Sequence, residues 1–215
     1  MLKAGVINRL SILSKKLEEC YACKLRIEMN SHLGGKALPF WSDRSWIMAI
    51  AEAPGREEVE NKTPLVGSAG KIFFSKMEKI SLVRKDFILL NSIQCRPIDI
   101  FEHNDKPLVK EQINCKKLWI DKYIEIFEPE YILAIGKYAI NSLMGNNNKD
   151  FYSITKLCGK VLSYEYSNNK SPVKVFPFLH PARLIYMPED NKFFDKSLRS
   201  LLKYINKDKR YKSSK

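Results

Sequence analysis

The sequence predicts an α/β fold, a three-layer α/β/α sandwich around a short, mostly parallel four-stranded sheet. Short apolar runs with the length of buried strands alternate with longer segments whose apolar residues recur at helical spacing. Such alternation implies a parallel sheet with helices on both faces. The 215 residues contain no internal repeat and no clear linker. We therefore expect a single domain over residues 1–206, followed by a basic, disordered tail at 207–215.

Four apolar runs are predicted to be the strands of this sheet: Trp46–Ala51, Phe87–Ile93, Tyr131–Ile135 and Val173–Leu179. The segment Ile154–Tyr166 contains a turn at Gly159, so it is expected to form a hairpin or an irregular pair of strands.

The predicted helices are Val6–Leu17, Ala69–Ile80, the long segment Leu108–Phe127, a short helix between Gly136 and Leu143, and Phe193–Ile205. The first helix alternates apolar and polar residues, unlike a signal peptide. Segments Lys24–Phe40, Ile98–Pro107 and Asn146–Asp150 are polar or rich in glycine and proline, and are predicted to be loops.

The composition indicates a soluble protein with an anionic partner. Apolar residues make up 45% and charged residues 28%, and no run approaches the ~18 uncharged apolar residues of a membrane span. A cytoplasmic or nucleoid-associated protein is expected. The net charge of +13 favours DNA, RNA or an anionic membrane surface. A lysine-rich proteome from an AT-rich genome is the alternative explanation of this charge.

Four of the five cysteines suggest a metal site. Cys20 and Cys23 form a C-x2-C pair, and Cys95 and Cys115 follow further along the chain. In a cytoplasmic protein such cysteines are more often metal ligands or redox thiols than disulfides. Four thiolates suit zinc or a [4Fe–4S] cluster, and the lack of a second C-x2-C pair favours the cluster. Buried free thiols are the alternative, and Cys158 is expected to be inert.

Polar residues gather where three predicted strands end. Glu52 begins the loop after the first strand, Asn91 lies near the end of the second, and His180 follows the fourth. The carboxyl ends of parallel strands meet at one edge of a sheet, where binding sites in such folds lie. These three side chains could therefore line one pocket.

At these strand ends the sequence resembles the uracil-DNA glycosylase superfamily, specifically its iron–sulfur branch, family 4. The resemblance is carried by AEAPGREE, TPLVGSAG, NSIQCRP, LAIGKYA and HPARL, with four cysteines in the family's order. It covers the chain from about Cys20 to Leu184.

The resemblance implies a monofunctional DNA glycosylase that flips a uracil or related pyrimidine out of DNA and hydrolyses its N-glycosidic bond. It implies that His180 donates a hydrogen bond where negative charge develops on the leaving base, and that Asn91 reads the pyrimidine edge. Glu52 and Glu58 match the two glutamates of the family's first motif, and could position the attacking water or stabilise the cationic sugar.

Other site residues follow from the same resemblance. Ala53 and Gly55 are expected to provide backbone groups and space for the base, and Ala53 stands where other branches carry a catalytic aspartate. Arg183 and Leu184 match the segment whose apolar tip fills the gap left by the flipped base. The cluster held by Cys20, Cys23, Cys95 and Cys115 is expected to be structural. DNA is the expected partner of a monomeric enzyme.

Two residues depart from the family pattern. Leu65 replaces the phenylalanine that would stack on the flipped base, and Ala51 replaces the first glycine of its motif. A weaker stack and a wider pocket leave two alternatives open: a glycosylase for a bulkier, hypermodified pyrimidine such as glucosylated hydroxymethylcytosine in phage DNA, or an inactive iron–sulfur module that only binds DNA.

Overall fold

The computed structural model describes residues 2–23, 25, 35–97, 109–145, 153–166 and 171–208. Its centre is a five-stranded sheet of order β2-β1-β3-β5-β4. Four strands are parallel: β1 (Ile47–Ala51), β2 (Phe87–Asn91), β3 (Tyr131–Ile135) and β5 (Val173–Phe178). β4 (Leu162–Tyr164) pairs antiparallel with β5 at one edge. The predicted α/β class and mostly parallel sheet are confirmed, but the predicted number of four strands is wrong.

The fifth strand comes from the segment Ile154–Tyr166, which was expected to be a hairpin or a pair of strands. Its first part is instead the short helix α8 (Ile154–Leu157), followed by a turn at Gly159 with φ of 86°. Leu157 and Cys158 are buried. Because this first part packs its apolar side chains as a helical turn, only β4 remains extended, and it pairs with β5 rather than with a neighbour of its own.

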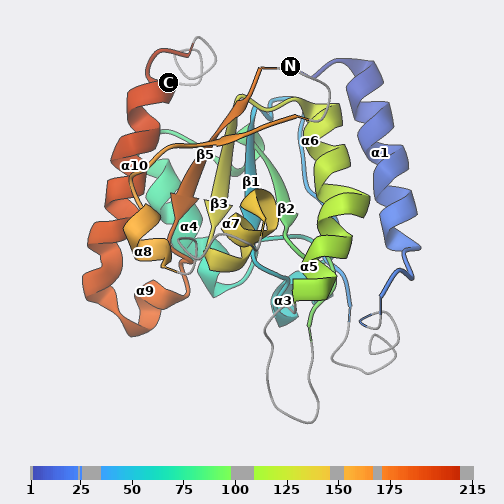
Figure 1. Ribbon diagram of the computed structural model, residues 1–215, viewed down its shortest axis with the longest axis horizontal. Coiled ribbons are helices and arrows are strands. Elements are labelled where there is room, and N and C mark those ends of the chain that lie inside the picture. Colours follow the sequence, from blue (N-terminus) through green and yellow to red (C-terminus); the bar gives the residue numbers. More distant parts are fainter. Residues whose placement is uncertain are drawn as a thin grey trace.

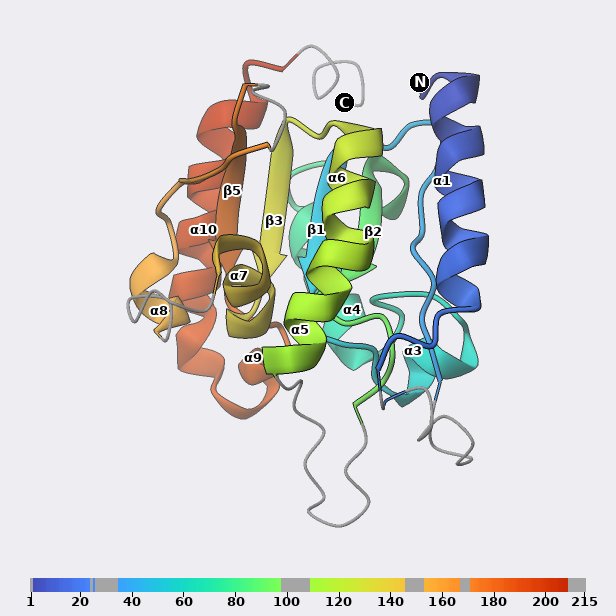
Figure 2. The same cartoon turned by 45° about the vertical axis from the view of Figure 1, so that its right-hand side comes forward.

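Helices cover both faces of the sheet, as Figures 1 and 2 show. One face carries α1 (Ala4–Glu18), α5 (Val109–Cys115), a π-helical turn (Lys116–Ile120), α6 (Asp121–Phe127) and α7 (Lys137–Met144). The other face carries α4 (Ser68–Glu78) and α10 (Asn191–Ile205). The remaining short elements are α3 (Arg56–Glu60), α9 (Arg183–Tyr186) and 3-10 turns at Arg84–Asp86 and Pro188–Asp190. The three-layer prediction is confirmed.

The two faces arise from the alternation of side chains along each strand. In β1, Met48 and Ile50 pack against the α1–α6 layer, whereas Ile47 and Ala49 pack against the α4–α10 layer. All five residues of β1 are buried. A strand buried on both faces reads as a continuous apolar run, and this is why the sequence predicts these strands well.

The predicted helices correspond to α1, α4, α7, α10 and the continuous helical segment from Val109 to Phe127. The predicted loops Ile98–Pro107 and Asn146–Asp150, most of Lys24–Phe40 and all but the first two residues of the tail lie outside the described residues.

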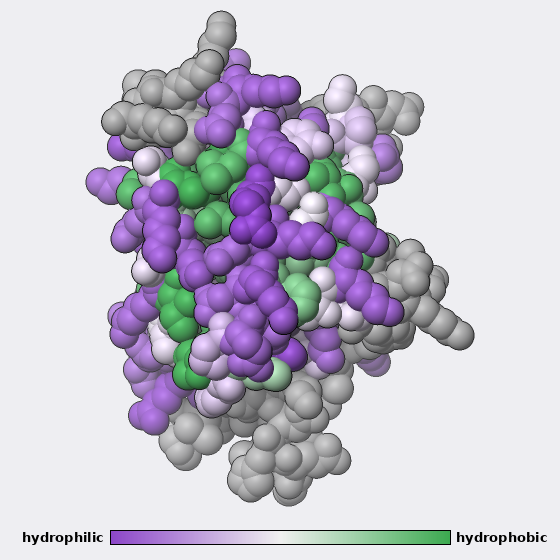
Figure 3. Space-filling view, turned by 90° about the vertical axis from the view of Figure 1, so that its left-hand side faces the viewer, coloured by the Kyte–Doolittle hydropathy of each residue, from purple (hydrophilic) through white to green (hydrophobic). Residues whose placement is uncertain are grey.

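The solvent face of α10 is strongly hydrophilic (Figure 3). Its exposed residues include Lys192, Lys196, Arg199 and Lys203. The buried face of the same helix contributes Phe194, Leu198, Leu201 and Ile205 to the core. Among the residues that the structure describes, no helix is long and apolar enough to cross a membrane.

Candidate active site at the carboxyl edge of the sheet

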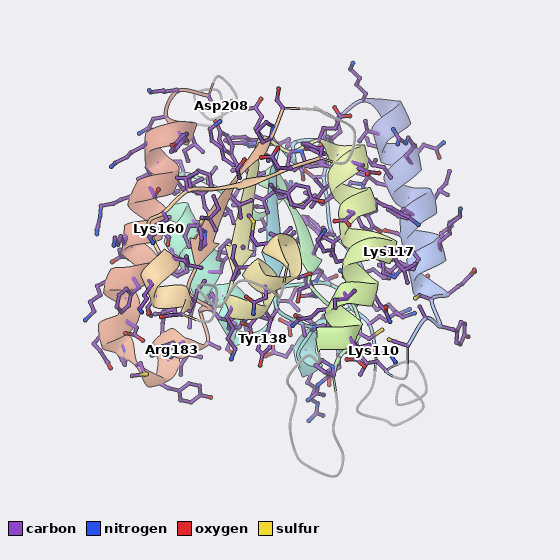
Figure 4. The ribbon with its side chains drawn as sticks, viewed as in Figure 1. Lys110, Lys117, Tyr138, Lys160, Arg183 and Asp208 are labelled. Carbon is purple, nitrogen blue, oxygen red and sulfur yellow. The ribbon has the colours of Figure 1, made fainter. Side chains whose placement is uncertain are left out.

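The strand order creates a natural place for a ligand. β2 lies on one side of β1 and β3 on the other, so the direction of chain progression reverses at β1. Open parallel sheets bind ligands beyond the carboxyl ends of their strands at such a reversal. Arg183 and Tyr138, which come from α9 and α7, lie at this edge of the molecule (Figure 4).

A pocket of about 380 Å³ lies beyond the ends of β1 and β2. Six of the predicted site residues line it: Ala53, Gly55, Glu58, Leu65, Asn91 and His180. Asn91 is the register partner of Ala51, so the last residues of β1 and β2 lie side by side. The size suits a ligand of the dimensions of a nucleobase, since small-molecule sites start at about 300 Å³.

Asn91 presents a buried amide to this pocket. Its residue is 1% exposed, and its Nδ2 has no hydrogen-bond partner among the described residues. Its backbone carbonyl accepts a hydrogen bond from Gln94 Nε2, which holds the strand end. A buried donor without a partner costs about 1–3 kcal/mol. Such a cost is expected where a ligand supplies the missing acceptor.

His180 lies two residues beyond the end of β5 and is partly exposed to the pocket. Its Nδ1 accepts a hydrogen bond of 3.4 Å from the backbone amide of Ala182. With Nδ1 acting as the acceptor, a neutral imidazole carries its proton on Nε2. The ring is therefore set up to donate a hydrogen bond from Nε2.

Glu58 lines the pocket, but its carboxylate is already occupied by the backbone. Oε1 accepts hydrogen bonds from the amides of Val66 (3.1 Å) and Gly67 (2.7 Å), and Oε2 accepts one from Gly55 (3.1 Å). The side chain therefore ties the loop after β1 to the loop before α4. This geometry makes Glu58 a residue that shapes the pocket wall.

Glu52 was predicted to line the pocket with Asn91 and His180, but its side chain lies instead against the N-terminus of α7. Its Oε1 accepts a hydrogen bond of 3.4 Å from the amide of Tyr138. Gly136 has φ of 91°, and a Cβ there would collide with the same carboxylate. Burial raises the pKa of the Glu52 carboxyl, and the nearby His180 and the Tyr138 amide partly oppose this rise. Glu52 thus remains electrostatically linked to His180.

The loop Pro64–Gly67, called the 64–67 loop below, forms one wall of the pocket. Leu65 is 5% exposed and has φ of 55°, in the left-handed region that non-glycine residues rarely adopt. Arg84, which the sequence did not single out, donates hydrogen bonds to the carbonyls of Leu65 (2.9 Å) and Pro64 (2.5 Å). Burial lowers the pKa of Arg84, while the charge of Glu58 opposes that change.

The two predicted DNA-intercalating residues differ in exposure, with Arg183 about half exposed and Leu184 buried. Leu184 is 7% exposed and packs in the core of the α4–α10 layer, and Arg183 Nε donates to Asp190 Oδ2 at 2.5 Å. The α9 turn points Leu184 inward and exposes the next residues, with Tyr186 81% exposed and Ile185 46% exposed. In this structure, which holds no DNA, Leu184 is thus buried and not exposed as an apolar tip, and its predicted role at the gap left by the flipped base stays a prediction. The apolar run after Leu184 was the signal that could have identified the exposed residues.

The four predicted metal-binding cysteines do come together. Cys20, Cys23, Cys95 and Cys115 line one pocket below the α1 C-terminus, with Trp119 beside them. Cys158 lies elsewhere, buried in the α4–α10 layer. Burial and the three neighbouring thiols raise the pKa of Cys115 to about 12, while the Gln94 backbone opposes this. Among the described residues, no three or more histidine, cysteine or acidic side chains are arranged to hold a metal ion.

Two buried side chains near this cysteine pocket, Lys36 and Trp119, bear on what it could hold. Lys36 is buried, and its Nζ donates to the carbonyls of Leu17, Glu18 and Cys20, which end α1. Trp119 Nε1 is buried without a hydrogen-bond partner in the described part of the chain. Trp119 lines the same pocket as the four cysteines, and a buried indole N–H without a partner fits a bound group that accepts a hydrogen bond.

Comparisons with known proteins agree with this geometry. Residues 38–202 match the sequence model of the uracil DNA glycosylase superfamily. A type-4 uracil-DNA glycosylase from Sulfurisphaera tokodaii is 27% identical over 95% of this chain and 89% of its own length. Proteins of the same name from Archaeoglobus fulgidus and Saccharolobus solfataricus are 28% and 29% identical, over 81% and 91% of this chain and 82% and 86% of their own lengths. The chain belongs to the uracil DNA glycosylase superfamily.

Proposed function

We propose that this protein is a monofunctional DNA glycosylase that excises uracil from DNA. The observation that carries the proposal is the pocket at the carboxyl edge, which is lined by His180 and by Asn91, whose Nδ2 has no partner among the described residues. The reaction would hydrolyse the bond between base and deoxyribose, leaving free uracil and an abasic site. The name of the curated relatives supports the same substrate.

Asn91 would recognise the base. A uracil edge offers a carbonyl oxygen and an adjacent N–H, and a carboxamide offers the complementary donor and acceptor. The free Nδ2 of Asn91 supplies the donor for that carbonyl. Cytosine carries an amino group at the same position and would place two donors against each other. This arrangement favours uracil over cytosine once the base has been flipped out of the duplex.

His180 would stabilise the departing base. When the N-glycosidic bond breaks, negative charge develops on the pyrimidine oxygen next to that bond. A hydrogen bond from Nε2 is available because Nδ1 is occupied by the Ala182 amide. Donors placed where charge develops in a transition state typically contribute about 10²–10³-fold to the rate.

The glutamates would act indirectly. Ala53 leaves no carboxylate at the position beside the base, so we assign no general base there. Glu58 is a positioning residue, because its two oxygens are held by three backbone amides. Glu52 lies close enough to His180 to influence it electrostatically, and its negative charge would stabilise a cationic sugar.

The cysteine pocket would hold a [4Fe–4S] cluster that fixes the loops around it. The support is the convergence of Cys20, Cys23, Cys95 and Cys115 and the unpaired Trp119 Nε1. A cluster with one iron for each cysteine holds the sulfurs further apart than a single zinc ion does, which suits cysteines that surround a pocket without forming a compact ligand set. When bound, the cluster would contribute structural stability.

Metal analysis tests the cluster separately from activity. Anaerobically purified protein should be brown and contain about four irons per chain, and Cys115→Ser should lose them. Cys158→Ser, outside the pocket, is the matched control and should keep them. One zinc and no iron in the anaerobic protein would refute the cluster.

Excision assays test the function. Wild-type protein should release free uracil from oligonucleotides that contain U·G, U·A or single-stranded uracil, and should leave cytosine and hypoxanthine in place. Oligonucleotides with hydroxymethylated or glucosylated cytosine extend the panel to bulky bases. DNA binding without release of any base would contradict the proposal. We further propose that residues 1–206 act as one cytoplasmic, monomeric domain, with the basic tail adding affinity for DNA.

A further inference from the structure

The wall of the pocket contains a residue with a strained backbone, Leu65, and neighbouring contacts must stabilise that conformation. Leu65 has φ of 55° and is buried, so its backbone adopts a conformation that costs energy for a side chain with a Cβ. Gly70 allows this conformation to pack, because a Cβ at Gly70 would collide with the carbonyl of Leu65. Leu65 lines the pocket together with Asn91 and His180.

The carbonyl side of the 64–67 loop is held by a single cation. The Arg84 guanidinium donates to Leu65 O at 2.9 Å and to Pro64 O at 2.5 Å, from nitrogens Nη1 and Nη2 respectively. A planar guanidinium can reach two adjacent carbonyls at once, whereas an ammonium group lacks that fixed fork.

Two aromatic rings hold the guanidinium in turn. The Cζ atom of Arg84 lies 4.8 Å from the ring centroid of Phe40 and 5.2 Å from that of Phe74. Cation–ring contacts of this kind are favourable and restrict the side chain to one arrangement. Phe40 belongs to the segment before β1 and Phe74 to α4, so the fork is fixed to two elements of the scaffold.

The amide side of the same loop is held by an anion. Glu58 accepts from the amides of Val66 and Gly67. Two side chains of opposite charge therefore bind the 64–67 loop. Arg84 donates hydrogen bonds to its carbonyls, and Glu58 accepts hydrogen bonds from its amides.

We infer that Arg84 is a positioning residue that fixes the backbone of Leu65 and thereby sets the width of the base pocket. This inference rests on the proposed uracil excision and adds a selectivity determinant to it. A second hollow of about 470 Å³ is lined by Leu65, Phe74 and Arg84, so Leu65 borders both this hollow and the base pocket. If the two hydrogen bonds from Arg84 are lost, this second hollow gives Leu65 space to move away from the base. The pocket then widens and discriminates less between uracil and its 5-substituted relatives.

The test compares Arg84→Met, Arg84→Lys and the control Arg44→Met. Methionine keeps apolar volume between the rings and removes both donors, while lysine keeps the charge without the fork. Arg44 pairs with Asp86 at 3.3 Å beside the same 3-10 turn and is about half exposed, so its loss measures a structural effect alone. Single-turnover excision is measured on DNA containing uracil, thymine or 5-hydroxymethyluracil.

Arg84→Met should lower uracil excision by about 10²-fold, as expected when a reacting group is misplaced by roughly an ångström. The rate ratio of uracil to the 5-substituted bases should fall at least about tenfold, because the wall retreats. Arg84→Lys should restore part of both, and Arg44→Met should change neither. Equal loss on all three bases, matched by Arg44→Met at the same loss of Tm, would overturn the inference.

Hydrogen exchange tests the role of Arg84 separately from the proposed uracil excision. Amide exchange at Val66 and Gly67 should accelerate in Arg84→Lys, and should stay at wild-type rates in Arg44→Met. This readout needs no activity, so it also decides the inference if Arg84→Met does not fold. If wild-type protein releases no uracil, the proposed function fails, whereas unchanged exchange in Arg84→Lys would refute the role of Arg84 itself.

Discussion

Asn91 carries a stability cost in the side chain that we propose recognises the base. Its Nδ2 is buried without a partner among the described residues, and such a group costs about 1–3 kcal/mol. A similar-sized apolar residue would remove that cost. Active sites commonly lose stability in this way in exchange for ligand recognition.

Asn91→Leu should therefore raise the free energy of unfolding by up to about 1–3 kcal/mol while abolishing uracil excision. Denaturant unfolding and an excision assay on the same preparation check the two effects. Ser142 also has a buried Oγ without a partner in the described part of the chain, but lies on α7 away from the pocket. Ser142→Ala is thus the control, and it should not lower excision. A destabilised Asn91→Leu variant would show that the amide is satisfied in the folded protein.

Glu52 provides a pH-dependent test at the same scale. Burial raises the pKa of its carboxyl above the ordinary value of 4.5. The folded protein then binds this proton more tightly than the unfolded chain, so ionisation of Glu52 lowers stability as the pH rises through the folded pKa. The contribution is favourable below 4.5 and is lost above the raised value.

Glu52→Gln should consequently be more stable than wild type at neutral pH, and this difference should shrink as the pH falls through the raised folded pKa and be gone below 4.5. Tm measured across the pH range checks the direction. Glu57→Gln, which removes an exposed carboxylate from the neighbouring helix α3, is the control and is measured over the same pH range. A Glu52→Gln variant that is less stable at neutral pH would mean that the α7 N-terminus outweighs the cost of burial.

At the scale of elements, α7 offers a matched pair of glycines. Gly136 and Gly145 flank its two ends with φ of 91° and 86°. A Cβ at Gly136 would collide with the Glu52 carboxylate, whereas a Cβ at Gly145 meets nothing within 4 Å among the residues that the structure describes. Backbone strain is common to both positions, and the contact with Glu52 is specific to the first.

Gly145→Ala should cost about 1–3 kcal/mol from its positive-φ, extended-ψ backbone alone, and Gly136→Ala should cost clearly more. Urea unfolding of both variants measures the difference. Adding Glu52→Ala to Gly136→Ala should recover the excess. Equal costs at the two glycines would show that Glu52 moves away freely and does not depend on Gly136.

The strands and the larger helices could be predicted because their patterns carry a direct physical meaning. β1 and β3 are buried at every position and are continuous apolar runs, whereas β2 departs from this only at its last residue, Asn91, and β5 only at the exposed Lys174. The segment Ile154–Tyr166 could not be assigned in the same way, since Gly159 permits a turn between two strands as readily as between a helix and a strand.

Site residues could be predicted where their position at the end of a strand brings them to the pocket. They could not be predicted where the direction of the side chain determines whether they reach it. Asn91 and His180 follow strand ends and reach the pocket as expected. The Glu52 side chain lies against the N-terminus of α7 and the Leu184 side chain lies in the core. The local backbone conformation decides both directions, and the sequence does not specify it. The sequence gives no indication of the position of Arg84, because Arg84 binds backbone carbonyls. Every residue has such a carbonyl, so no particular partner residue marks the interaction.

For the whole molecule, the net charge of +13 predicts salt-dependent DNA binding. The logarithm of affinity should fall steeply and linearly with the logarithm of salt concentration, because lysine and arginine contacts release counterions from phosphates. Deleting residues 207–215 should weaken binding to all sequences by the same factor and reduce this slope, since such contacts do not read bases. A filter-binding or anisotropy titration at several salt concentrations checks both effects. Affinity that is independent of salt would contradict DNA as the partner.

The central claim is that the pocket of Asn91 and His180 releases uracil, and one measurement tests it most directly. Wild type and His180→Ala are compared in single-turnover excision of a uracil-containing duplex, with the free base identified by mass spectrometry and DNA affinity measured in parallel. The account predicts free uracil from the wild type, and a rate lowered about 10²–10³-fold in His180→Ala with nearly unchanged affinity. Unaltered uracil release by His180→Ala, or no free base from the wild type on DNA that it binds, would contradict it.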